Sequence, residues 1–223
     1  MQIRFGLCLQ EQVYPERVEG IDLTLGESGF LQWAEQQLGI RHEERQAHLR
    51  TEQYRQVLAA YLSYTPKAFF ADSFSADAWH TTEVLLSMRD ELLLAGWKFA
   101  TLAADAPQRL QTLAQVERIA EQGQVAVLDK GFAERFLAVE DTLRLRALPL
   151  DVLHVNEPLE LLPVHWRRLL SALQAANVRV VPIDLPPIAA VGEGATDLQR
   201  FQAAVFASSG KPQRQPLRAD GSL

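Results

Sequence analysis

The chain has 223 residues, with 22 basic and 28 acidic side chains and a formal net charge of −6 at pH 7. Its hydrophobic fraction of 48% and charged fraction of 22% are those of a soluble globular protein, which argues against extensive intrinsic disorder. The acidic balance also argues against strong, autonomous binding to nucleic acid, because proteins of that class usually present an excess of Lys and Arg.

Cysteine usage and hydropathy exclude further classes of protein and of metal site. Cys8 is the only cysteine, so neither an intramolecular disulfide nor a multi-thiolate metal site can form. It lies in the apolar run from Ile3 to Leu9, which predicts a cysteine buried in a strand. The first residues lack the pattern of a signal peptide, and no run of about 18 apolar residues occurs. We therefore expect a cytoplasmic protein without a membrane span.

The N-terminal part predicts strands followed by a helix. Residues 2–9 alternate as in a strand, and residues 20–25 form a weaker second strand candidate. A loop at 26–29 leads into a helix predicted over 30–38, which Gly39 would terminate as a C-cap.

The middle of the chain is mostly helical in pattern. Apolar residues recur at helical spacing over 41–64, and Pro66 ends that segment. Two further helices are predicted over 106–122 and 131–145. Between these segments, Ser75 or Asp77 can cap another helix that runs to about Ala95, with Gly96 as its terminator.

The helix ending near Ala95 has a wide apolar face, which predicts burial of Trp79 and Met88 together with its leucines. Arg89 falls inside this apolar arc. A buried arginine needs a carboxylate or carbonyl partner, so we interpret Arg89 as a structural tie.

The C-terminal part returns to strands. Residues 150–155 and 178–183 predict strands on either side of a helix at 161–175, the spacing of a parallel βαβ unit with a right-handed crossover. A last helix is predicted over 196–208, and the tail from Ser209 to Leu223 reads as loop.

This order of elements predicts an α/β fold in which strands from both ends of the chain share one parallel sheet. The helical middle is then an insertion. We assign residues 1–40 and 148–223 to the α/β core and residues 41–147 to a helical insertion subdomain.

The loop after the second predicted strand occupies the position of a phosphate-binding loop. It contains Gly26, Glu27, Ser28 and Gly29. A working P-loop has the pattern G-x-x-x-x-G-K-[ST], whose amides, lysine and hydroxyl hold the phosphates and the metal. Here the lysine position is apolar and Glu27 would repel phosphate, so we expect no ATP binding.

No other motif predicts catalysis, a cofactor or a metal site. The five histidines lack metal-ligand spacing, and neither a G-x-S-x-G elbow nor a nuclease signature is present. We therefore assign no catalytic residue. Asp151 and Asp184 could flank strand ends, where open α/β sheets bind ligands. Arg167 and Arg168, and Lys211 and Arg214 in the tail, are the candidate contacts to a phosphate backbone.

Three segments together resemble a known family. They are the helical stretch Ser73–Trp97, the loop and helix Gly26–Gly39, and the segment Arg214–Leu223. They are similar to the N-terminal region of inactivated superfamily I helicases that carry a C-terminal PD-(D/E)XK nuclease, the group of the AddB/RexB subunit of recombination nucleases.

The resemblance implies a helicase 1A-type, P-loop-like core with an eroded P-loop and a large helical insertion of the 1B type. It implies a noncatalytic region that positions DNA or a helicase/nuclease partner subunit, with the nuclease residues beyond Leu223. The alternative from the residues themselves is a stand-alone small α/β enzyme acting on a metabolite at the carboxyl ends of the strands, near Asp151 and Asp184.

Overall fold

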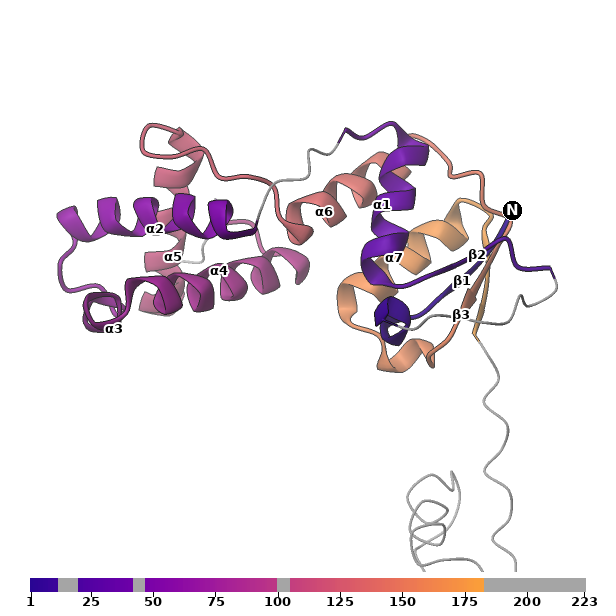
Figure 1. Ribbon diagram of the computed structural model, residues 1–223, viewed down its shortest axis with the longest axis horizontal. Helices are drawn as coiled ribbons and strands as arrows, with labels where there is room; N and C mark the ends of the chain where they lie inside the picture. Colours follow the sequence, from indigo (N-terminus) through magenta and orange to yellow (C-terminus); the bar gives the residue numbers. More distant parts are fainter. Residues whose placement is uncertain (12–19, 42–46, 100–104, 183–223) are drawn as a thin grey trace, which may run out of the picture. The chain divides into compact units, whose positions relative to one another are not determined.

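The computed structural model describes residues 1–11, 20–41, 47–99 and 105–182 (Figure 1). The helix predicted over 196–208 and the tail that follows it lie outside the described residues.

Four short strands form one parallel sheet. They are β1 (Gln2–Phe5), β2 (Leu23–Leu25), β3 (Val152–Val155) and β4 (Arg179–Pro182), and their order across the sheet is β2-β1-β3-β4. Strands from both ends of the chain therefore meet in one sheet, as predicted. The mixed α/β class and the parallel sheet are confirmed.

One face of the sheet is covered by helices. Figure 1 shows α1 (Glu27–Leu38) and α7 (Val164–Ala175) on the same side of the strands, and α6 (Phe132–Leu143) contacts both helices. Because side chains alternate along a strand, β1 turns Ile3 and Phe5 to this face, where neither side chain is exposed. We call it the first face of the sheet.

Trp166 of α7 is the central side chain of the core on the first face. It is fully buried, and its ring centroid lies 4.5 Å from that of Phe5, 5.0 Å from that of Phe136 and 5.8 Å from that of Phe30. One aromatic residue thus joins a strand and three helices, which is consistent with the large area that a buried tryptophan contributes to a core.

The remaining helices form a second hydrophobic cluster. They are α2 (Ala47–Tyr64), α3 (Ala71–Ala76), α4 (Ala78–Leu94) and α5 (Gln108–Gln122). Tyr54 and Val57 of α2 and Leu85 of α4 are among the buried residues of this cluster. The segment 131–145, which we had grouped with the insertion, forms α6, and its Phe136 and Val139 belong to the cluster of the sheet.

The predicted helix terminators are observed. Gly39 caps α1 with a φ of 73°, and Gly96 follows α4 with a φ of 89°, a backbone conformation that glycine adopts without strain. Asp77, one of the two predicted caps of α4, accepts a hydrogen bond of 2.9 Å from the backbone N–H of His80. The short helix α3 was not predicted.

Three local predictions were wrong. The first strand ends at Phe5, and the chain continues as the 3₁₀ helix η1 (Leu7–Glu11), so Cys8 is exposed rather than buried in a strand. On α4, Trp79 is 40% exposed and Met88 is 46% exposed. The neighbouring helices cover only the centre of the apolar arc of α4, and these two residues lie at its margins.

Candidate functional site

The predicted phosphate-loop position lies at the start of α1. The helix begins at Glu27 rather than at Phe30, so Glu27, Ser28 and Gly29 belong to its first turn and Gly26 is the N-cap. The segment follows β2, which pairs only with β1 among the described strands. Phe30, near the position where a P-loop carries its lysine, is 1% exposed and packs in the core.

The carboxylate of Glu27 is held by α7. Its Oε1 accepts a hydrogen bond of 2.7 Å from the indole N–H of Trp166, and Nε2 of His165 lies 3.9 Å from the same oxygen. The His165 imidazole lowers the pKa of the Glu27 carboxyl, aided by Trp166 and against the opposing effect of burial. A negative side chain therefore occupies the first turn of α1, where the helix dipole favours an anion.

The two aspartates of the alternative hypothesis are not brought together. Asp151 precedes β3, at the amino ends of the strands, and its carboxylate contacts the amino group of Met1. Ligands of open α/β sheets bind at the opposite edge, beyond the carboxyl ends. Asp184 lies outside the described residues.

The carboxyl ends of the central strands carry polar residues that the sequence analysis did not single out. Arg4, on β1, donates to Oδ1 of Asn156 from Nη2 at 2.8 Å and from Nε at 3.2 Å. The backbone N–H of Cys8 donates to Glu157 at 3.3 Å, and the amide of Asn156 lies 3.8 Å from the sulfur of Cys8. The second carboxylate oxygen of Glu157 is buried and has no hydrogen-bond partner within the described structure.

Gly6 allows the chain after β1 to approach the chain after β3. A Cβ at this position would lie 2.7 Å from Cβ of Asn156 and 2.9 Å from Cγ of Leu9. Both are closer than real Cβ contacts, so a glycine is needed here for packing. The side chains near this edge are thus fixed by a close backbone contact between segments far apart in sequence.

A network of charged side chains joins the helical cluster to α6. Arg89, 7% exposed, donates to Glu117 at 2.7 Å and to Glu134 at 2.5 Å, as expected for a structural tie. Arg50 makes a bidentate pair with Asp90, both distances being 2.7 Å, and also contacts Glu134. Glu134 of α6 therefore binds arginines from α2 and α4 at once.

Burial and the neighbouring arginines act in opposite directions on the pKa values of the acidic members of this network. Burial raises the pKa of Glu117 despite the nearby charge of Arg89. Glu134 is desolvated as well, but Arg89 and Arg50 together hold the pKa of its carboxyl below its usual range. The hydroxyl of Tyr54 is buried beside the network without a hydrogen-bond partner among the described residues. We interpret the whole arrangement as structural.

Two more arginines tie α6 to its neighbours. Arg135 makes a bidentate pair with the buried carboxylate of Glu35 on α1, at 2.6 and 2.9 Å. Arg168 on α7 pairs with Glu140 through two hydrogen bonds of 2.5 and 2.7 Å. The charge of Arg168, a predicted DNA contact, is therefore already balanced by a carboxylate.

The other predicted contacts to DNA differ in position. Arg167 is exposed and lines a shallow pocket of about 230 Å³ between η2 (Leu159–Leu161) and α7, together with Glu160 and Leu170. Its place on α7 is away from Arg168, which faces α6. Lys211 and Arg214 lie outside the described residues.

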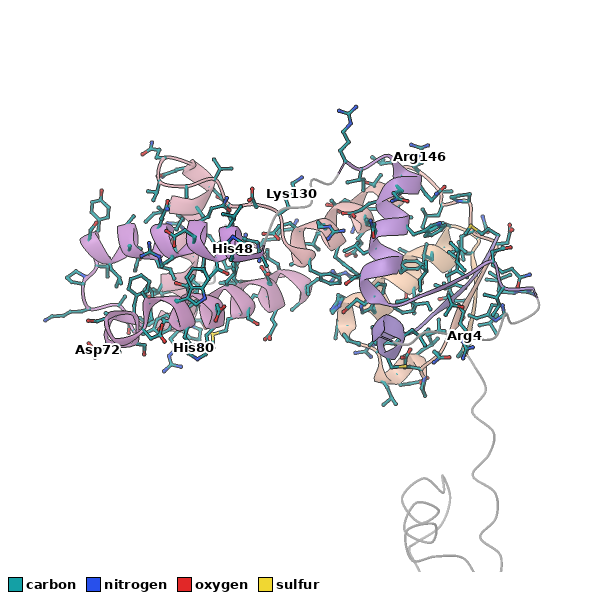
Figure 2. The ribbon with its side chains drawn as sticks, in the orientation of Figure 1. Arg4, His48, Asp72, His80, Lys130 and Arg146 are labelled. Atoms are coloured by element: carbon teal, nitrogen blue, oxygen red, sulfur yellow. The ribbon has the colours of Figure 1, made fainter. Side chains whose placement is uncertain are left out.

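The histidines in the described part of the chain lie on four different elements, with His154 on β3 and His165 on α7. His48 and His80 come from α2 and α4, where Figure 2 labels them. In the part of the chain that the structure describes, no three His, Cys, Asp or Glu side chains are arranged to hold a metal ion. Among the same residues, no helix combines the length and hydropathy needed to cross a lipid bilayer.

Comparison with known proteins adds no family to this description. No protein-family model, curated protein or solved structure matches the chain.

Proposed function

We propose that this chain is a noncatalytic, helicase-like region of a DNA repair or recombination nuclease, which positions DNA or a partner subunit and does not bind ATP. The observation that carries the proposal is the contact between Glu27 and Trp166 at the start of α1. A carboxylate held there by the protein itself takes the place that a nucleotide phosphate takes in an active P-loop.

The electrostatics of this position oppose a nucleotide. The first turn of a helix attracts anions because its backbone N–H groups are unpaired and the helix dipole is positive at that end. Glu27 already supplies that negative charge, and Trp166 and His165 stabilise its ionised form. A triphosphate would meet like charge without a lysine to offset it, since the core residue Phe30 lies near the lysine position.

The order of elements also supports the proposal. The parallel sheet is interrupted between α1 and β3 by helices α2 to α5, which build their own hydrophobic cluster. A helicase first domain of the resembling family has this order of a parallel α/β core and a helical insertion. An α/β core with a helical insertion and with a glutamate at the phosphate-loop position suits a structural role better than ATP-driven movement.

A pair of titrations tests the proposal. A fluorescent ATP analogue with Mg²⁺ should show no saturable binding, and a fluorescently labelled oligonucleotide should bind weakly, with an affinity that falls steeply between 50 and 200 mM salt. The Glu27→Gln variant is the matched control, because its amide oxygen still accepts from Trp166. Saturable nucleotide binding by the unmodified chain, or tight DNA binding independent of salt, would contradict the proposal.

A further inference from the structure

The second face of the sheet differs in character from the first. Alternation along the strands and the observed register place Gln2, Arg4, Thr24, Val152, His154, Arg179 and Val181 on it. No α-helix of the described part of the chain lies on this face (Figure 1). In a chain with a net charge of −6, these strand positions hold two arginines and a histidine and no acidic residue.

Arg4 differs from the other partly buried arginines in its partner. Arg4 donates through two N–H groups to a neutral amide oxygen, that of Asn156. No carboxylate pairs with it among the described residues. The other described arginines that are buried or partly buried each pair with a carboxylate: Arg50, Arg55, Arg89, Arg135 and Arg168. Arg4 is thus held in orientation while its charge is left unneutralised within the described structure.

The neighbours of Arg4 on this face can also donate hydrogen bonds. The register sets Thr24 on one side of Arg4 and His154 on the other. Adjacent strands lie about 4.8 Å apart, so a hydroxyl, a guanidinium and an imidazole form one row across the sheet. His154 contacts Oε1 of Gln2 through Nε2 at 3.2 Å. Figure 2 labels Arg4 beside the strands.

We infer that the row Thr24–Arg4–His154 on the second face of the sheet is a phosphate-contact site, at which Arg4 binds the sugar–phosphate backbone of a nucleic acid. The inference rests on the proposed function and names the surface that carries it. A guanidinium fixed in orientation and lacking a counter-charge suits an anion with several acceptor oxygens. The site lies on the face opposite α7, so it differs from the contacts predicted at Arg167 and Arg168.

Two substitutions test the site in the full-length chain, with a labelled oligonucleotide as the probe. Arg4→Gln removes the charge. Asn156→Asp keeps Arg4 and places a carboxylate against it. Losing one phosphate contact should weaken binding about eightfold at 0.1 M salt. It should also reduce by about 0.9 the steepness with which the logarithm of the binding constant falls with the logarithm of salt concentration.

The matched controls are on α5. Arg118→Gln removes an exposed arginine, and Gln122→Glu places a carboxylate one helical turn from Arg118. Both variants change the net charge as the test variants do, so general electrostatic repulsion is the same in each pair. We expect the affinity of both controls to stay within about twofold of the unmodified chain.

The outcomes separate the site from the proposed function. The inference is supported if oligonucleotide affinity falls in both test variants and not in the controls. DNA affinity that is unchanged in Asn156→Asp, or is lost equally in Gln122→Glu, overturns it and leaves the proposed DNA contact in place. Failure of the unmodified chain to bind any oligonucleotide at 50 mM salt overturns the inference together with the DNA-positioning role in the proposed function. Full competition by millimolar inorganic phosphate at constant ionic strength indicates a free-phosphate site and overturns the nucleic-acid assignment.

Discussion

Nε of Arg89 on α4 lies 2.7 Å from a carboxylate oxygen of Glu117 on α5, and both side chains are almost completely buried. Arg89 also reaches Glu134 on α6, so one guanidinium links three helices. A buried pair of this kind costs desolvation energy when it forms. Its removal is harmful mainly because the partner charges are left without compensation.

Replacing Arg89 with Met should therefore destabilise the protein by about 3–5 kcal/mol, because Glu117 would remain buried without its cation and Glu134 would keep only Arg50. Equilibrium urea unfolding measures this change. The control is Arg55→Met, which removes a partly exposed arginine paired with Glu52 on the same helix. That variant should lose less than about 1 kcal/mol. Equal losses in the two variants would contradict the central role of Arg89.

The charge of Glu27 should make stability depend on pH. The pKa of Glu27 is lowered in the folded protein from an ordinary value of 4.5. The ionised carboxylate therefore stabilises the folded state fully above pH 4.5, and this stabilisation is lost as pH falls through the folded pKa. Glu27→Gln should thus be less stable than the unmodified protein at pH 7, and the difference should shrink below pH 4.5. Urea unfolding at pH 7 and at low pH measures both values. A constant difference across the range would show that the ionised carboxylate is not stabilising.

Two glycine substitutions should have opposite effects. Gly6→Ala forces a Cβ against Asn156 and Leu9 and should cost about 1–3 kcal/mol through overpacking. Gly29→Ala meets nothing closer than 3.5 Å and lies in the first turn of α1, so it should stabilise the protein by roughly 0.5–1 kcal/mol. Thermal unfolding of the two variants compares them directly. A loss of stability in Gly29→Ala would show that this glycine has a structural role that its surroundings do not indicate.

The two candidate caps of α4 can be separated by substitution. Asp77→Ala removes the acceptor for the N–H of His80 and should cost about 1 kcal/mol. Ser75→Ala changes an exposed residue of α3 and should stay within about 0.5 kcal/mol of the unmodified protein. Chemical denaturation resolves this difference. The reverse order of effects would mean that α4 begins at Ser75 in solution.

Local patterns predicted much of the fold. The α/β class, the βαβ unit at 150–183 and the helix terminators Gly39 and Gly96 follow from alternation, helical spacing and glycine's tolerance of positive φ. The burial of Arg89 was also predicted, because this arginine lies among the apolar residues on the core-facing side of its helix. These features depend on residues close together in the chain, and a sequence displays them directly.

The residues that were wrongly predicted to be buried are exposed for a common reason. Trp79 and Met88 were predicted to be buried because they are apolar, yet they are exposed because neighbouring helices cover only part of α4. Cys8 is exposed because the chain turns at Gly6 and leaves the sheet. In each case the sequence shows the character of a side chain, whereas its surroundings depend on elements distant in the chain.

The amino-acid sequence by itself determined most of the strands and helices, and that the phosphate-loop position carries an acid in place of a cation. Only the tertiary structure decided which charges meet. It paired Glu27 with Trp166 and Arg168 with Glu140, and it gave Arg4 a neutral partner, Asn156. The physical reason is that local geometry follows backbone and side-chain preferences over a few residues. The pairing of charges depends instead on the strand order and helix packing, which bring into contact residues between 28 and 152 positions apart.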